Sequence, residues 1–424
     1  MSTIMFLLGA ALVVGLGFAL RPYMPDPAAD DTEVALEGVH PGLLYGRVTT
    51  VDGELFEGSL RFGGDEEALW SNQFNGIRRT NDWSQYIPQE MAPAAGRSWR
   101  FLGMEVRVAS RPDLKRPFLA RFGDITQIEA RGRDLRVTLK SGTVARLDRY
   151  AADDFADGVR VWDRSGRVVE LGEREIRSIE FFAPPVAGAG PAPLFGTVQT
   201  PQGVFTGLIQ WDREAALLQD RLQGRSVTGE PVDLRFDAVQ AGVRHGREGA
   251  TVLLKGGGTV NLARAGSYRG GHRGLYVDDP QYGRVLISWN TVERVELHPG
   301  TAPGYAEFGP GRLLGGTVTT HAGRSLSGRI VFDLDEQEST ETLDAPADGV
   351  DYMIPFELIA GIDPLGPAAR DGARLHLRSG EELRLEQEGD LGAANAGILI
   401  FTAEGSAPEY VPWAEVDRIE LEWT

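Results

Sequence analysis

The chain has 424 residues, of which 42% are hydrophobic and 25% charged, a balance that excludes disorder for most of its length and favours several domains. It contains no cysteine, which excludes disulfides, zinc–thiolate sites and thiol nucleophiles. The formal net charge of -18 repels phosphate backbones, so we expect no nucleic-acid partner.

The N-terminal residues 4–20 form an unbroken run of apolar and small side chains. The run is slightly short for a bilayer span and long for the hydrophobic region of a signal peptide, so residues 1–21 are predicted as a signal anchor or a cleaved signal peptide. The polar, proline-containing residues 22–43 are predicted as a linker. We therefore expect an extracytoplasmic protein, periplasmic or at the cell surface, that contacts the membrane through residues 4–20.

Three later segments align without a gap, with the sequences LYGRVTT at 44–50, LFGTVQT at 194–200 and LGGTVTT at 314–320. Each continues through two glycines into an alternating stretch that ends on an aromatic residue, Phe62, Trp211 or Phe332. Such alternation is typical of a strand, a turn and a second strand with every other side chain buried. The 54 glycines and 24 prolines agree with short strands joined by tight turns.

Two further blocks recur in the same order. A turn motif lies at 140–142, 255–257 and 378–380, and a closing apolar strand lies at 176–181, 292–297 and 416–421. This repetition predicts an all-β fold of three tandem modules. The predicted modules are residues 44–183, 194–298 and 313–424, joined by linkers at 184–193 and 299–312. The run 212–222 has helical propensity, but the repeat predicts a non-helical segment there.

The glycine turns, short strands and closing I-x-x-I-E strand resemble those of Sm-like or SH3-like small β-barrels, and similar units are repeated in bacterial envelope proteins. The resemblance implies that each module contains one or two such barrels. It implies no catalytic or binding residue, because the turn motifs with which the Sm family contacts RNA are missing and a fold does not determine a function.

Residues 77–117 have no counterpart in the other modules and are predicted as an insertion in the first. They carry eight basic and four acidic residues in an acidic protein, together with four aromatic residues, and this is the composition of binding hot spots. The candidate partner-binding residues are Arg78, Arg79, Trp83, Tyr86, Arg97, Trp99 and Arg100. The alternative is an extra hairpin that caps the first module, with packed aromatic side chains and arginines paired to the acidic body.

The loop before the last hairpin of a module is basic only at 264–273, where Tyr268 and His272 are further candidates for partner binding. An acidic cluster comprises Asp333, Asp335, Glu336 and Glu338. The cluster lacks the residue order of an EF-hand loop and is predicted as a solvated turn. The six histidines are scattered without metal-ligand spacing, so neither a metal site nor a cofactor is predicted.

No sequence motif indicates a reaction, since the protein has no G-x-S-x-G nucleophile motif and no phosphate-binding glycine motif. The leading hypothesis is a non-enzymatic platform of the cell envelope, either structural or for a protein partner. The first alternative is a carbohydrate- or peptidoglycan-binding protein, in which Trp83, Trp99 and Trp162 stack on sugar rings. The second is an envelope hydrolase that uses dispersed carboxylates.

Overall fold

The computed structural model describes residues 39–63, 66–70, 73–88, 98–101, 104–107, 116–163, 165–185, 188, 191–265, 272–366, 369, 371–393, 395–403 and 405–422, with the backbone alone at 98–101 and 104–107. The described residues form strands β1 to β32, which confirms the predicted all-β class. The predicted membrane segment at 4–20 and most of the linker at 22–43 lie outside them. Among the described residues, no helix has the length and apolar character needed to cross a bilayer.

The first copy of the repeat (residues 44–183) contains β1 (Tyr45–Thr50), β2 (Leu55–Phe62), β3 (Gln73–Ile77), β6 (Pro117–Arg121), β7 (Ile125–Arg131), β8 (Asp134–Leu139), β9 (Val144–Asp148), β10 (Val159–Asp163), β11 (Val168–Leu171) and β12 (Ile176–Phe181). The insertion adds β4 (Ser98–Phe101) and β5 (Met104–Arg107) between β3 and β6. Eight strands form an antiparallel sheet in the order β11-β10-β2-β1-β12-β7-β8-β9, while β3 pairs with β6 and β4 with β5.

The second copy (194–298) contains β13 (Phe195–Thr200), β14 (Gly203–Trp211), β15 (Arg221–Ser226), β16 (Pro231–Arg235), β17 (Val239–His245), β18 (Gly249–Leu254), β19 (Thr259–Ala265), β20 (Leu275–Asp279), β21 (Gly283–Ile287) and β22 (Arg294–His298). The third copy (313–424) contains β23 (Gly315–Thr320), β24 (Ser325–Val331), β25 (Thr342–Ala347), β26 (Val350–Pro355), β27 (Ile359–Pro364), β28 (Ala373–Leu377), β29 (Glu382–Leu385), β30 (Ile398–Phe401), β31 (Glu409–Val411) and β32 (Val416–Glu422).

The second and third copies repeat the eight-strand order of the first copy, which confirms the repetition. The run 212–222 is non-helical, as the repeat register predicts.

The second copy consists of two five-stranded units with related topology, whereas in the first and third copies the outer unit has the same five-strand order and the strands of the inner unit are divided between two sheets. In the second copy the outer unit has the order β21-β20-β14-β13-β22 and the inner unit the order β16-β15-β19-β18-β17. The strands of the inner unit can be counted in the sequence β18, β19, β15, β16, β17, which starts in the middle of the unit and continues from its beginning. Counted in this way, they occupy the same places in the sheet as β13, β14, β20, β21 and β22 of the outer unit. The two units are therefore circular permutations of one another. A short 3-10 turn precedes the last strand of the inner unit in every copy, as in η5 (Phe236–Ala238) before β17, and that of the outer unit in the third copy, where η10 (Trp413–Glu415) precedes β32.

The predicted small barrels are not closed by hydrogen bonds among the described residues. Each large sheet is an open ladder with two edge strands, because strands such as β16 and β17 follow one another through a 3-10 turn without pairing. The fold class is therefore confirmed at the level of repeated antiparallel sheets, whereas closed barrels are absent from the described part of the protein.

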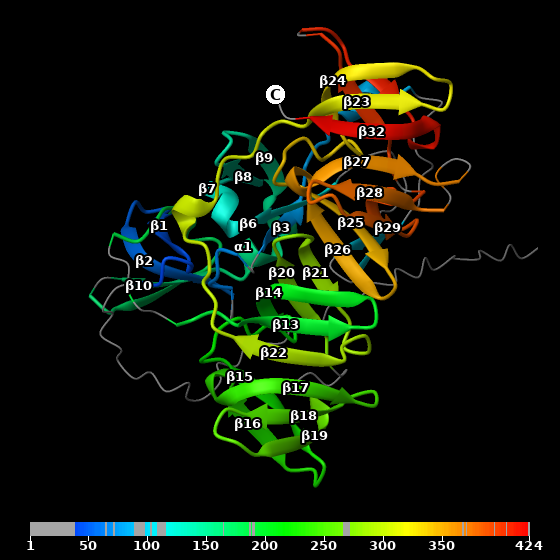
Figure 1. Cartoon of the computed structure of the whole chain (residues 1–424). Helices are drawn as coiled ribbons and strands as arrows, with labels where there is room; N and C mark the ends of the chain where they lie inside the picture. The colour runs from blue at the N-terminus through cyan, green and yellow to red at the C-terminus, as the bar shows by residue number, and fades with distance from the viewer. Residues whose placement is uncertain are drawn as a thin grey trace, which may run out of the picture. The chain divides into compact units, whose positions relative to one another are not determined.

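One hairpin occupies a different place in each copy. The pair β3–β6 forms a sheet of its own, and β15 pairs with β19 at the edge of its own copy. In the third copy, β26 instead pairs with β21 of the second copy, with Tyr352 opposite Val285, so that one sheet of twelve strands crosses the boundary between the copies. Figure 1 shows β25 and β26 beside β20 and β21.

The glycine at the third position of each aligned segment has the same surroundings in all three copies. A Cβ atom on Gly46 would lie 2.2 Å from the backbone oxygen of Glu180, on Gly196 2.1 Å from that of Glu296, and on Gly316 2.0 Å from that of Glu420. Only glycine lets the first and last strands of a copy approach this closely. The recurring glycines are therefore explained by strand pairing.

The hydrophobic interior is continuous between the second and third copies. One cluster of buried side chains contains residues of both, and Phe205, Tyr282 and Tyr352 contact one another edge to face at their boundary. The three predicted modules therefore do not each have an interior of their own, because these two copies share one. The reason is the shared twelve-stranded sheet, which places β21 and β26 side by side.

The predicted linker at 299–312 is packed against the first copy. Phe308 is buried in the core cluster of that copy, and the hydroxyl of Tyr305 donates a hydrogen bond of 2.9 Å to the carbonyl of Ile125. The Lys140 ammonium donates to the carbonyl oxygens of Tyr305 and Phe308. This segment is a fixed joint, because its side chains belong to the interior of a neighbouring copy.

Candidate functional site

The described part of the insertion lies against the third copy. Residues 78–88 follow β3 and contain the short 3-10 helix η1 (Ser84–Tyr86). The Asn81 side-chain amide donates a hydrogen bond of 3.0 Å to the carbonyl of Leu334. The insertion therefore joins two copies that are far apart in sequence.

The aromatic candidates Trp83 and Tyr86 pack on the third copy. Their rings meet the ring of Phe401 edge to face, at centroid distances of 5.7 and 6.4 Å. The Arg329 guanidinium lies 3.9 Å from the Phe401 centroid and 5.3 Å from that of Trp83. Both insertion aromatics are half-buried and belong to the periphery of a small apolar cluster that includes Leu334. Much of their surface is thus used for contacts within the protein.

Two arginines of the insertion reach acidic residues of the third copy. Arg116 and Asp333 form a bidentate pair with nitrogen–oxygen distances of 3.0 and 3.3 Å, and each side chain is only 1% exposed. Arg78 donates to Glu341 at 2.9 Å. Arg79 pairs with Asp134 of its own copy at a more exposed place. These contacts agree with the alternative interpretation of the insertion, in which its arginines pair with acidic residues of the rest of the protein.

The acidic loop, which we define as residues 333–341, is not a solvated turn. Asp333, Asp335 and Glu338 are buried, so the sequence prediction for this cluster is wrong. The loop folds back after β24 because Asp333 and Leu334 have positive φ values of 44° and 64°, and the same turn occurs at Asp212 in the second copy. Isolated bridges then hold the returning segment in all three copies. The insertion and the first copy cover this loop in the third copy.

Hydroxyl groups of the first copy complete the cover of the acidic loop. Ser141 donates a hydrogen bond of 2.9 Å to Glu338, and Thr143 donates to the same carboxylate oxygen. Within the described residues, no group of three or more acidic or histidine side chains has an arrangement that could hold a metal ion. Glu338 of the third copy therefore contacts the first copy through these two hydroxyl groups.

Burial raises the pKa of several carboxyl groups around this contact. The pKa of Asp344 is raised to about 7, mainly by burial and further by the charge of Asp335. The pKa values of Glu336 and Asp390 are raised well above their usual range for the same reasons. The charges of Asp333, Asp335 and Glu336 raise the pKa of Arg116 against the effect of its own burial. These carboxyl groups therefore bind a proton more readily than exposed carboxyl groups do.

A cavity of about 410 Å³ lies where the insertion, the first copy and the acidic loop meet. It is lined by Arg78, Thr80, Asn81, Asp82, Trp83, Arg136, Val144, Ala145, Arg146, Leu334, Asp335 and Gln337. We call it the arginine pocket. Arg136 on β8 lies directly opposite Arg146 on β9, and neither forms an ion pair with any described residue. A pair of facing cations on neighbouring strands is unfavourable, so this pocket is the candidate for a ligand.

The remaining candidates from the sequence are not brought together with the pocket. His272 is buried, with its ring stacked on Trp289 at a centroid distance of 4.3 Å. Burial, assisted by the charge of Arg273, lowers the pKa of His272 to about 3. The side chain is therefore neutral and packs in the interior. Tyr268 and Arg97 lie outside the described residues, and Trp99 and Arg100 have only their backbone described, on β4.

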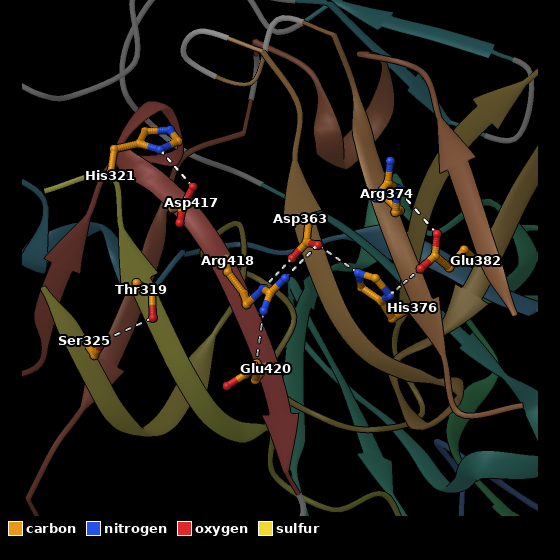
Figure 2. Close-up of polar contacts among 10 residues, drawn as sticks. All are labelled: Thr319, His321, Ser325, Asp363, Arg374, His376, Glu382, Asp417, Arg418 and Glu420. Carbon is orange, nitrogen blue, oxygen red and sulfur yellow. Dashed lines mark hydrogen bonds and ion pairs between the residues drawn. The ribbon is translucent and has the colours of Figure 1, made fainter. Parts of the chain in front are cut away.

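The outer face of the third copy carries a row of polar side chains, shown in Figure 2. Asp363 accepts hydrogen bonds from His376 at 2.8 Å and from Arg418 at 2.9 Å. Burial alone would raise the pKa of Asp363, but these donors hold it below its usual range. Ser325 bonds to Thr319 in the same row and not to His376, so no serine–histidine pair forms here. The row is the solvated face of a sheet.

The stacking aromatics required by a glycan-binding protein are only partly available. Trp162 is half-buried, and the guanidinium groups of Arg61 and Arg160 lie 5.5 and 5.6 Å from its ring centroid. Trp83 is half-buried beneath Arg329, as described above. The arrangement favours neither residue as a sugar-stacking platform.

No protein-family model, curated protein or solved structure matches this sequence. Arg78 and Trp83 of the arginine pocket were candidates from the sequence, whereas Arg136 and Arg146 were missed. Arg136 and Arg146 belong to ordinary alternating strands, and the available signal was two arginines at facing positions of a predicted hairpin around Gly142. Two facing arginines indicate a binding site only because the insertion and the acidic loop cover this hairpin in the folded protein.

Proposed function

We propose that the protein is a non-enzymatic platform of the cell envelope that binds a protein partner, and that residues 4–20 tether or export it. The observation that supports the proposal is the way in which the copies are fixed to one another. The shared twelve-stranded sheet joins the second copy to the third, the Arg116–Asp333 pair joins the first to the third, and the segment 299–312 is packed on the first. Such joints hold surface positions at constant spacing, which is a property of a scaffold.

We also propose that each five-stranded unit is an open form of an SH3-like or Sm-like barrel. The supporting observations are the shared strand order of the inner and outer units in the second copy and the 3-10 turn before the last strand of the inner unit in every copy. On this interpretation the protein has six such units, nested in pairs within the three copies.

The proposed function is tested in the source cell with the full-length protein. A photo-reactive amino acid is placed at Arg146 in the arginine pocket, at Val204, whose side chain is exposed near the start of β14, or at Val227 in an exposed turn, and the cells are fractionated after irradiation. We expect the protein in the envelope fraction and a reproducible crosslink to one envelope protein from at least one of these positions. Recovery in the cytosol, or turnover of a defined substrate by the purified protein, would contradict the proposal.

A further inference from the structure

The arginine pocket contains positive charge that the fold itself does not require. Arg136 and Arg146 face each other on neighbouring strands, where like charges are destabilising. In the second copy the equivalent pair is Thr251 and Asn261, which share a hydrogen bond of 2.7 Å. Neutral side chains are thus compatible with the same strand pairing. Strand pairing therefore does not explain why the first copy has two arginines at these positions.

The third copy carries arginines at the same place but neutralises one of them. Arg374 lies opposite Arg384, and its guanidinium is 3.6 Å from the carboxylate of Glu382. In the first copy, Arg136 and Arg146 have no such carboxylate among the described residues. The Nε atoms of Arg136 and Arg78 are buried, and no hydrogen-bond partner for them occurs in the described part of the protein. The described part of the protein therefore provides neither a counter-charge for Arg136 nor a hydrogen-bond partner for its Nε atom.

The charges of the pocket define the ligand. Its lining contains three arginines and two aspartates, and because Arg78 is paired with Glu341, the cations without a carboxylate partner among the described residues are Arg136 and Arg146. A carboxylate brings a single negative charge to this facing pair, whereas the second charge of a phosphate dianion would be repelled by Asp82 and Asp335. The planar fork of a guanidinium matches the two oxygens of a carboxylate. Trp83 and Val144 offer apolar contact to the rest of the ligand.

We propose that the arginine pocket binds a carboxylate of a peptide, held between Arg136 and Arg146. A volume of about 410 Å³ is within the range of sites for small ligands and accommodates one or two amino-acid residues. The carboxylate is either the C-terminus of the peptide or an acidic side chain within it, which present the same group. This inference goes beyond the proposed function because it concerns a ligand chemistry and holds wherever the protein resides.

The test is isothermal titration calorimetry on the purified full-length protein in detergent, with three peptides and inorganic phosphate. The peptides are N-acetyl-trialanine with a free C-terminus, its C-terminal amide, and N-acetyl-alanyl-glutamyl-alanine amide. We expect saturable binding of at least one carboxylate peptide at concentrations up to about 10 mM, and no binding of the trialanine amide. The two carboxylate peptides distinguish a C-terminus from an acidic side chain.

Arg136→Gln and Arg146→Gln are expected to weaken the binding at least about tenfold, since each removes a charge-assisted hydrogen bond. The matched controls are Arg374→Gln and Arg384→Gln, at the same register positions in the third copy, and they should leave the affinity unchanged. Circular dichroism establishes that all four variants are folded. Equal binding by the pocket variants and the wild type, tighter binding of phosphate, or no binding of either carboxylate peptide would overturn the proposal.

Discussion

Arg116 and Asp333 have been removed from water almost completely, since each side chain is 1% exposed. Such a pair does not gain much net stability over apolar residues of the same size, because both charges lose their hydration. Loss of one partner is a different matter, since the other then remains as an uncompensated buried charge. The pair therefore favours this arrangement of the first and third copies over others.

Arg116→Met is expected to lower the free energy of unfolding by about 3–5 kcal/mol, measured by urea unfolding followed by circular dichroism. The matched control is Arg131→Met, which removes an ion pair with Glu129 whose side chains are 58% and 27% exposed. It should cost less than about 1 kcal/mol. The double variant R116M/D333N should recover part of the loss, because it also removes the stranded carboxylate. Equal losses in the two arginine variants would argue against a buried pair in solution.

Asp344 gives the stability a pH dependence with a definite sign. Its pKa is about 7 in the folded protein, against 3.8 for an unperturbed aspartate, so between these values the folded state binds a proton that the unfolded state has lost. Stability from this group is fully present below the unfolded pKa and is lost as the pH rises through about 7, with a slope of at most about 1.4 kcal/mol per pH unit. Urea unfolding at about pH 5 and about pH 8 measures it.

We expect the wild type to be less stable at the higher pH than at the lower, and Asp344→Asn to show a smaller difference between the two. Asp163 is the control, because hydrogen bonds from Ser165 and Arg167 hold its pKa below the usual range. Its contribution is present above the unfolded pKa and disappears in acid, so Asp163→Asn should leave the difference between the two pH values unchanged. If Asp344→Asn retained the full difference, other carboxyl groups of the cluster would have to account for it.

At the scale of elements, the strands follow from alternation and glycine turns, and the repeat register correctly overrules the helical propensity of 212–222. The position of the hairpin β25–β26 could not be predicted in this way. The alternating pattern of this hairpin is compatible with pairing to any sheet edge. The choice of β21 as its partner depends on the packing of Tyr352 against Phe205 and Tyr282. Long-range choices of this kind leave no local pattern in the sequence.

The burial of the acidic loop was equally unpredictable. Four acidic residues within six positions indicate a solvated turn as long as only their own neighbourhood is considered. Their counter-charge, Arg116, is 217 residues away in sequence and belongs to an insertion that only the first copy carries. The prediction failed because the compensating cation lies in another copy.

The pairing of β26 with β21 predicts a difference between equivalent strands. β11, β21 and β31 hold the same position in their copies, but β21 is interior to its sheet whereas β11 and β31 are edges among the described strands. Hydrogen exchange measured by mass spectrometry should therefore be slower at 283–287 than at 168–171 and 409–411. Equal exchange at the three segments would mean that β26 does not pair with β21 in solution.

At the scale of the molecule, a shared sheet and a continuous core make the second and third copies one cooperative unit. Ile362 is fully buried in the third copy and belongs to the cluster that also contains Val252 of the second. Ile362→Ala should lower the free energy of unfolding by about 2–5 kcal/mol. Because the core is continuous, the substitution should lower the urea midpoint of unfolding, measured by hydrogen exchange, in β13 and β14 of the second copy together with that in β27 and β28 of the third. Modules joined only by flexible linkers would leave the midpoint of the second copy unchanged, and that outcome would also remove the main support for a rigid platform.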